Sequence, residues 1–215
     1  SQMSWEPFDL YAERYDQWFA DEPGRSIFPS EVAAIELLLN GTGSRRLEIG
    51  VGTGRFARSL GTTLGLDPAL GVLRMAQRRG VEVVQGVGEA LPIASASFDV
   101  VLFVATLCFL DDARAALGEA ARVLGPGGAV VVADVIADSP WGRFYLEQKD
   151  AGHPFYAEAS FYTLGQISRL LEEVGLGIAG SASTLVQPPG TVGIATEKPA
   201  RGVAPEASFV CLLAT

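Results

Sequence analysis

The feature that most constrains the fold is a regular alternation of short apolar segments and helical segments along the middle of the chain. We expect strands at residues 45–49, 63–66, 81–85, 98–104 and 129–134. We expect helices between them at residues 55–61, 69–79 and 113–124. The last two strands are apolar at nearly every position, with no alternation of apolar and polar residues. Because such runs are typical of parallel strands that helices bury on both faces, the sequence predicts an α/β fold.

The two ends of the chain depart from this alternation. Residues 1–30 are expected to form a helical amino-terminal segment, and Pro29 to open a helix over residues 30–39. After a helix over residues 164–174, strands at 178–187 and 208–214 are separated by a loop rich in Pro and Gly and can form an antiparallel hairpin at one edge. The prediction is a three-layer sandwich around a mostly parallel, seven-stranded sheet, built as a single domain over residues 1–215.

The composition and net charge of the chain exclude several kinds of binding partner. Sixteen basic and 25 acidic residues give a net charge of −9, and nucleic-acid binding requires the opposite, a basic footprint. Anionic membranes are equally poor partners for such a chain. Cys108 and Cys211 lie in apolar runs, no metal-ligand spacing is present, and no segment has the pattern of a signal peptide or a membrane span. We therefore expect a cytoplasmic protein that binds neither nucleic acid, membrane nor metal.

A glycine-rich turn, Leu-Glu-Ile-Gly-Val-Gly-Thr-Gly-Arg-Phe at residues 47–56, follows the first expected strand. Glycine permits positive φ and a close approach of the backbone to a ligand, and open α/β sheets bind ligands at this end of their strands. Asp67 ends the second strand, where its carboxylate can accept both hydroxyls of a ribose. Read from Gly52, the turn also fits a dinucleotide fingerprint, which fails at Arg55 when read from Gly50. The turn alone thus leaves open a nicotinamide-dependent oxidoreductase, or a turn without any ligand.

Four further motifs follow the turn: Leu-Asp-Pro at residues 66–68, Gly-Glu-Ala-Leu-Pro at 88–92, Ser-Phe-Asp at 97–99, and Arg-Val-Leu-Gly-Pro-Gly-Gly at 122–128. In order and spacing, the five motifs resemble those of class I S-adenosylmethionine-dependent methyltransferases, of the small-molecule type that includes ubiquinone and menaquinone methyltransferases. Residues 11–19 and 163–175 are similar to helices of that family, so the resemblance covers nearly the whole chain. It implies the Rossmann-like form of the sandwich and speaks against the oxidoreductase. A non-catalytic module that binds S-adenosylmethionine remains an alternative to an enzyme.

The resemblance implies S-adenosylmethionine as the cofactor. The backbone of the turn would pack against its methionine and ribose, and Asp67 would bind the ribose diol. Glu48 would act through the amino group, or would brace the turn as a buried acid. Val87 stands where the family frequently has an acid, which leaves adenine recognition to backbone groups, apolar walls or Glu89. The predicted cofactor-binding residues are Glu48, Gly50, Val51, Gly52, Gly54, Asp67, Pro68, Gly88, Glu89 and Ala105.

Residues 138–162 interrupt the alternation and are expected to form an aromatic, lid-like insertion. Their aromatic side chains predict either an apolar wall for a small-molecule acceptor or a plain seal against the sheet. His153 is the only imidazole available as a base, although Gly-His-Pro is typical of an exposed turn. The net charge of −9 favours a small apolar or neutral acceptor over nucleic acid. The chain lacks an Asn-Pro-Pro-Tyr motif, which argues against methylation of an exocyclic amine of the type that motif serves. The predicted acceptor-binding residues are Tyr15, Thr106, Tyr145, His153 and Tyr156, with the catalytic group and the oligomeric state left open.

Overall fold

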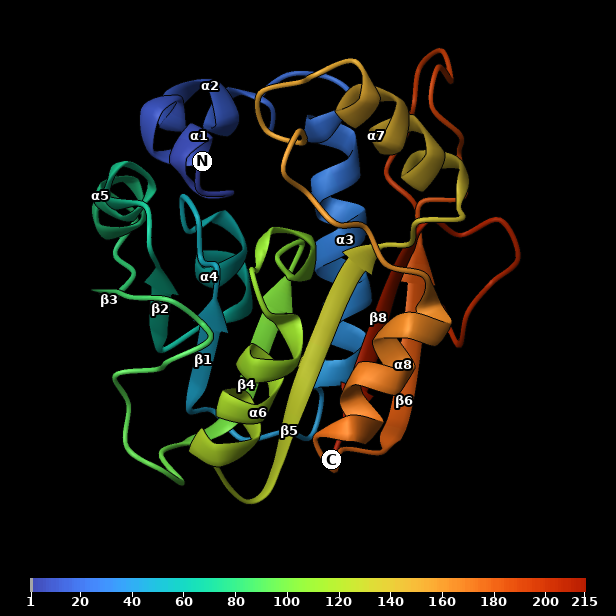
Figure 1. Ribbon diagram of the computed structural model, residues 1–215. Coiled ribbons are helices and arrows are strands. Elements are labelled where there is room, and N and C mark those ends of the chain that lie inside the picture. Colours follow the sequence, from blue (N-terminus) through green and yellow to red (C-terminus); the bar gives the residue numbers. More distant parts are fainter. Residues whose placement is uncertain (1) are drawn as a thin grey trace.

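One eight-stranded sheet runs through the computed structural model, which describes residues 2–215 (Figure 1). Its strands are β1 (Arg46–Ile49), β2 (Leu64–Asp67), β3 (Val83–Gln85), β4 (Phe98–Val104), β5 (Leu124–Val135), β6 (Ile178–Thr184), β7 (Ala200–Arg201) and β8 (Phe209–Ala214). Their order is β3-β2-β1-β4-β5-β8-β6-β7. Strands β1 to β5 pair in parallel, so the chain winds outward in both directions from the boundary between β1 and β4. Ligands bind at such a switch point in open α/β sheets.

The carboxyl-terminal strands form the expected antiparallel hairpin. Strand β8 lies between β5 and β6 and pairs antiparallel with both. The α/β sandwich predicted from the sequence is confirmed. The structure adds an eighth strand, β7, whose two residues pair with Ala182 and Ser183 of β6. A strand this short has no hydrophobic period that a sequence pattern can reveal.

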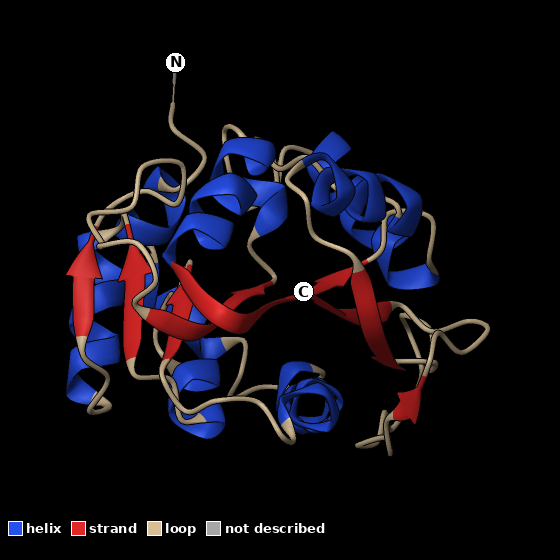
Figure 2. Ribbon diagram, turned by 90° about the horizontal axis from the view of Figure 1, so that it is seen from below, coloured by secondary structure: helices blue, strands red, loops and turns tan. Residues whose placement is uncertain are grey.

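Helices cover both faces of the sheet (Figure 2). They are α1 (Glu6–Leu10), α2 (Ala12–Gln17), α3 (Gly24–Leu39), α4 (Arg55–Leu60), α5 (Leu70–Arg78), the 3-10 helix η1 (Leu107–Phe109), α6 (Ala113–Val123), α7 (Pro140–Asp150) and α8 (Leu164–Glu173). The side chains of β4 alternate between two cores, because Val101 and Phe103 pack with α6 and α8 whereas Val100 and Leu102 pack with α3 and α4. None of the helices in residues 2–215 is long and apolar enough to cross a membrane.

Helix α3 begins at Gly24, so the expectation that Pro29 opens this helix is wrong. A proline ring is compatible with helical φ, and its missing N–H removes one hydrogen bond near the start of the helix. The turns on both sides of Pro29 are anchored by buried side chains, which include Ile27 and Ala34. Tertiary burial therefore outweighs the local proline signal.

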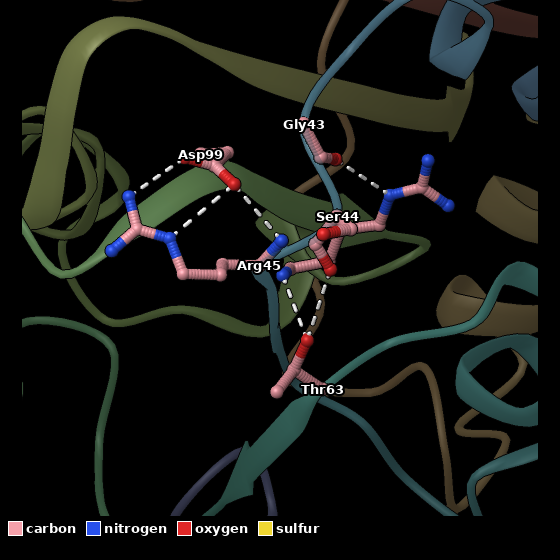
Figure 3. A network of polar contacts seen from close by, with 6 residues as sticks. Gly43, Ser44, Arg45, Thr63 and Asp99 are labelled. Carbon is pink, nitrogen blue, oxygen red and sulfur yellow. Dashed lines mark hydrogen bonds and ion pairs between the residues drawn. The ribbon is translucent and has the colours of Figure 1, made fainter.

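Asp99 of the Ser-Phe-Asp motif has a structural role at the amino ends of β1, β2 and β4 (Figure 3). Asp99 accepts hydrogen bonds from the backbone N–H of Arg45 at 3.0 Å and from its guanidinium at 2.8 Å. Thr63 Oγ1 accepts from the backbone N–H of Arg46 at 3.0 Å and donates to the Ser44 carbonyl at 3.1 Å. These contacts fasten the start of β1 to β4 and β2.

Candidate active site

A chamber lies where the carboxyl ends of β1, β2 and β4 meet the amino-terminal helices, which cap this end of the sheet in Figure 1. Its walls contain nine of the ten predicted cofactor-binding residues: Glu48, Gly50, Val51, Gly52, Asp67, Pro68, Gly88, Glu89 and Ala105. Gly54 lies outside this chamber, which we call the cofactor chamber because it gathers the predicted cofactor-binding residues. A Cβ atom at Gly54 would come within 2.9 Å of the Ala76 Cβ, so Gly54 allows α4 and α5 to pack closely.

Two glycines of the turn face different surroundings. Both have positive φ, +72° at Gly50 and +55° at Gly52. A Cβ atom at Gly50 would overlap Thr106 Oγ1 at 2.3 Å, whereas one at Gly52 would have only Tyr15 Cε1 within 4 Å, at 3.8 Å. Gly50 therefore serves internal packing, and Gly52 leaves open the space in front of the turn.

Asp67 joins the turn to the end of β2. Its Oδ2 accepts the Gly52 N–H at 3.0 Å, and its Oδ1 accepts the Ala69 N–H at 2.9 Å. Burial raises the pKa of Asp67 to about 6, although both N–H groups act in the opposite direction. Each carboxylate oxygen can accept a second hydrogen bond, so Asp67 retains acceptor capacity toward the chamber. Its contact with a ribose stays a prediction.

Glu48 is 1% exposed, and its Oε1 has no hydrogen-bond partner in the described chain. Burial, with a contribution from Asp67, raises the pKa of Glu48 well above its ordinary value. The described residues show no hydrogen bond from Glu48 to the turn, which removes support from the bracing role. A buried acceptor without a donor is costly, so this oxygen is a candidate for a donor from a ligand, and its contact with a cofactor stays a prediction.

Glu89 and Gly88 shape the neighbouring wall. Glu89 Oε1 accepts the backbone N–H groups of Asp111 and Asp112, at 2.9 and 3.3 Å, and so fixes the loop before α6. A Cβ atom at Gly88 would lie 2.8 Å from Ile49 Cγ2. Val87 is 41% exposed and also lines the chamber. The roles of these residues toward adenine stay predictions.

An ion cluster that the motifs do not predict fastens α2 over the turn. Arg55 donates from Nε to Asp16 Oδ1 at 2.8 Å and from its Nη2 to Oδ2 at 2.8 Å. Arg79 donates to Asp16 Oδ2 at 2.8 Å and to the Thr53 carbonyl at 2.8 Å. Burial alone would raise the pKa of Asp16, but the two guanidinium groups outweigh it and lower the pKa to about 2. The one feature of the sequence that bears on this cluster is Arg55, the residue at which the dinucleotide fingerprint fails when it is read from Gly50.

A second chamber adjoins the first and is lined by four of the five predicted acceptor-binding residues, Tyr15, Tyr145, His153 and Tyr156. Tyr15 lines both chambers, together with Phe19 and Ala105. Thr106 belongs only to the cofactor chamber, where its hydroxyl donates to the Val104 carbonyl at 3.0 Å. We call this second cavity the acceptor chamber.

The His153 imidazole is half-buried in the acceptor chamber. Its Nδ1 accepts the Phe155 N–H at 3.3 Å, and the centroids of the His153 and Tyr156 rings are 4.8 Å apart. Burial, with the charge of Arg14, lowers the pKa of His153, so the ring is neutral at pH 7. Ala105, at the boundary of the chambers, has a φ of +49°, a strained value for a residue other than glycine.

Comparison with known proteins identifies the family to which this fold belongs. Residues 47–132 match the sequence profile of a family described as "Methyltransferase domain". A solved structure from Thermotoga maritima, described as a SAM-dependent methyltransferase and possible histamine N-methyltransferase, is 35% identical, with a TM-score of 0.91 over 98% of this chain and 99% of that chain. This chain belongs to the class I S-adenosylmethionine-dependent methyltransferases.

Two relatives show over how much of the chain the sequence similarity to other proteins extends. An uncharacterized protein of Mycobacterium tuberculosis is 41% identical over 203 residues, which are 94% of this methyltransferase and 71% of the relative. A demethylmenaquinone methyltransferase of Renibacterium salmoninarum is 36% identical over 98 residues, 43% of this chain and 41% of that protein. The shorter match agrees with the resemblance to menaquinone methyltransferases without defining an acceptor.

The cofactor chamber fits S-adenosylmethionine, the methyl donor of the family. Its amino group would supply a donor to the Glu48 oxygen that has no partner in the described chain, and the open face of Gly52 leaves room for a ligand beside the backbone. Asp67 offers acceptors to a diol. When bound, the cofactor supplies an activated sulfonium methyl group, and the protein supplies position and electrostatic setting.

Replacing Gly52 by Val tests whether this turn is the cofactor wall. The branched side chain would fill the space in front of the turn, and we expect binding of S-adenosylmethionine to become undetectable by calorimetry. The matched control is Gly61→Val, because Gly61 has a similar φ of +65° but only the Arg46 guanidinium, at 4.0 Å, near its Cβ position. The two variants share the backbone strain, so equal affinities would contradict the assignment.

The ion cluster predicts a specific acid dependence of stability. The pKa of Asp16 is lowered in the folded protein, so its contribution is complete above about pH 4 and is lost as pH falls towards 2. We expect Asp16→Asn to reduce the free energy of unfolding at pH 7 by about 2 kcal/mol. Urea titrations of both proteins at several pH values measure this difference, which should shrink below pH 4. A difference independent of pH would show that the charge of Asp16 is not what stabilises α2.

Proposed function

We propose that this methyltransferase transfers the methyl group of S-adenosylmethionine to a small molecule held in the acceptor chamber. The observation that carries the proposal is the junction between the chambers, which share Phe8, Tyr15, Phe19, Phe56, Ala105 and Phe109 as lining residues. A sulfonium in one chamber and a nucleophile in the other would lie next to each other at this junction. An in-line displacement requires this kind of placement.

The walls of the acceptor chamber support a small acceptor. Aromatic rings from α2, α7 and the following loop enclose it, and the centroids of Tyr145 and Tyr156 are 4.9 Å apart. An enclosed, mostly aromatic site with a few polar groups is typical of small-molecule recognition. The Thermotoga maritima relative is likewise described with a small molecule as its possible acceptor.

A screen of small-molecule acceptors tests the proposal, with release of S-adenosylhomocysteine as the readout. For an acceptor that reacts, Tyr145→Ala and Tyr156→Ala should each reduce turnover at least about tenfold, because misplaced reactants lose much of the rate. Cofactor affinity should stay unchanged. Tyr11→Ala is the control, since Tyr11 is 45% exposed and lines neither chamber.

Tight cofactor binding with no release from any small acceptor would contradict the proposal. It would favour the module that binds S-adenosylmethionine without catalysis. Release that persists in both tyrosine variants would place the acceptor elsewhere.

We also propose that part of the aromatic insertion opens to admit the acceptor. The first part is anchored, because Trp141 is 4% exposed and its indole N–H donates to the Gln187 carbonyl at 2.8 Å. The end is anchored at Ser160, whose N–H donates to the Cys108 carbonyl at 2.7 Å. Residues 151–158 lie between these anchors and carry His153, Phe155 and Tyr156 over the acceptor chamber.

Hydrogen exchange tests this lid. Amides of residues 151–158 should exchange faster than those of β4 and β5 in the free protein, because local opening costs less than unfolding the sheet. Exchange should slow when S-adenosylhomocysteine and an acceptor occupy the chambers together. Protection equal to that of the central strands in the free protein would show that these aromatic residues are permanent core.

A further inference from the structure

Two acids that no sequence motif includes, Glu31 and Asp134, line the acceptor chamber. Glu31 lies on α3 and is 7% exposed, and Asp134 lies near the end of β5 and is 5% exposed. Asp134 Oδ1 accepts the N–H of Val135 at 2.9 Å. Within residues 2–215, the Glu31 carboxylate has neither a hydrogen-bond donor nor a cationic partner.

Other ionisable groups around these acids do not neutralise them. Arg14 is exposed at the rim, where its guanidinium lies 5.9 Å from the centroid of Phe155. The other titratable groups that line the chamber or act on the two acids are Tyr15, Asp21, Glu22, Cys108, Tyr145, His153, Tyr156, Tyr162 and Cys211. None of these groups is a cation at pH 7. The interior of the chamber therefore holds two acids without a cationic partner among the described residues.

Burial of an unpaired carboxylate is unfavourable, and the group responds by holding a proton or a cation. Burial raises the pKa of Glu31 to about 8, with a further contribution from Asp134, and burial raises the pKa of Asp134 to about 7. The two acids titrate as a pair near neutral pH, so they can exchange a proton with a ligand.

The aromatic walls favour the same kind of ligand. Tyr15, Phe144, Tyr145, Tyr156 and Phe161 line the chamber with the acids. Aromatic faces attract ammonium groups, and this attraction is strong where water is excluded. The described residues contain no group of three His, Cys, Asp or Glu side chains able to hold a metal ion, which favours an organic cation.

We propose that the methyl acceptor is a small amine that Glu31 and Asp134 bind as its ammonium ion and that is methylated on nitrogen. This inference rests on the proposed methyl transfer. It replaces the expectation of an apolar or neutral acceptor, which came from the net charge of the whole chain. Net charge describes the surface, whereas recognition depends on the charges inside the chamber.

The reaction balances with these two acids. A carboxylate accepts one proton from the ammonium group and frees the nitrogen lone pair. The lone pair forms the N–C bond to the methyl carbon while the C–S bond breaks, and its electron pair remains on sulfur as a neutral thioether. The methylated product is again an ammonium ion, and the proton on the carboxyl group leaves to solvent. Glu31 and Asp134 thus bind the acceptor and receive its proton.

Binding of a simple probe tests the inference without knowledge of the natural acceptor. Calorimetry with n-butylammonium chloride and with n-butanol, each in the presence of S-adenosylhomocysteine, should show binding of the ammonium ion alone. Glu31→Gln and Asp134→Asn should each weaken this binding at least about tenfold, since each removes a charge-assisted contact. Glu36→Gln is the control, because Glu36 is an exposed acid on the same helix. Equal binding of the alcohol, or no effect of either substitution, would overturn the inference.

Stability separates ligand recognition from a structural role. Glu31→Gln replaces a buried acid that has neither a hydrogen-bond donor nor a cationic partner by a neutral group of the same size, so its melting temperature should equal or exceed that of the parent protein. Affinity for S-adenosylmethionine should remain unchanged. A lower melting temperature together with unchanged n-butylammonium binding would show that Glu31 only supports the fold.

Turnover distinguishes this inference from the proposed function. With matched panels of primary amines and alcohols, we expect release of S-adenosylhomocysteine from amines, and a loss of release in Glu31→Gln. Release from alcohols or thiols alone would overturn the amine and leave methyl transfer intact. If no acceptor reacts while n-butylammonium binds through the two acids, methyl transfer fails and the cation site stands.

Discussion

The carboxylate of Asp16 holds two guanidinium groups at the carboxyl end of the sheet, and the organisation of both chambers depends on this contact. Arg55 begins α4 and Arg79 follows α5, so a single acid joins three elements that are distant in sequence. The preceding residue on α2, Tyr15, lines both chambers. A short helix has little stability of its own. The ion cluster therefore supplies the position of α2, and with it part of the lining that the two chambers share.

The buried acids of this methyltransferase differ in whether the described residues supply partners for their carboxyl groups. Arginines neutralise Asp16, and two backbone N–H groups satisfy Asp67. Glu48 retains an oxygen without a donor, and Glu31 retains a carboxylate without any partner. Asp16 and Asp67 join elements of the fold, although Asp67 also lines the cofactor chamber. Glu48 and Glu31 line the two chambers, where a bound ligand would supply the missing donor or cation.

Features set by local sequence were predictable, and features set by tertiary contact were not. The glycine turn and Asp67 follow the carboxyl ends of β1 and β2, which the apolar runs of the sequence locate. Because parallel strands end at the same edge of a sheet, the sequence predicts that these residues lie close together. Glu31 occupies one position of a helix, where an acid usually indicates a solvated face. Only the packing of α3 against β5 and β8 brings it to the acceptor chamber. The start of α3 was mispredicted for the same reason, because burial around Pro29 overrides its local preference.

The amino-terminal helices and the aromatic insertion pack against each other and together cover the chambers, although they are separated by more than a hundred residues of sequence. The Phe155 ring lies 5.1 Å from Phe8 and 5.8 Å from Tyr15, measured between centroids. Phe8 and Tyr15 line both chambers, and Phe155 lines the acceptor chamber. Movement of residues 151–158 to admit an acceptor must therefore disturb the aromatic contacts above the cofactor. The ion cluster fixes α2 but does not include the insertion. In the proposed opening, residues 151–158 would therefore move while α2 stays in place.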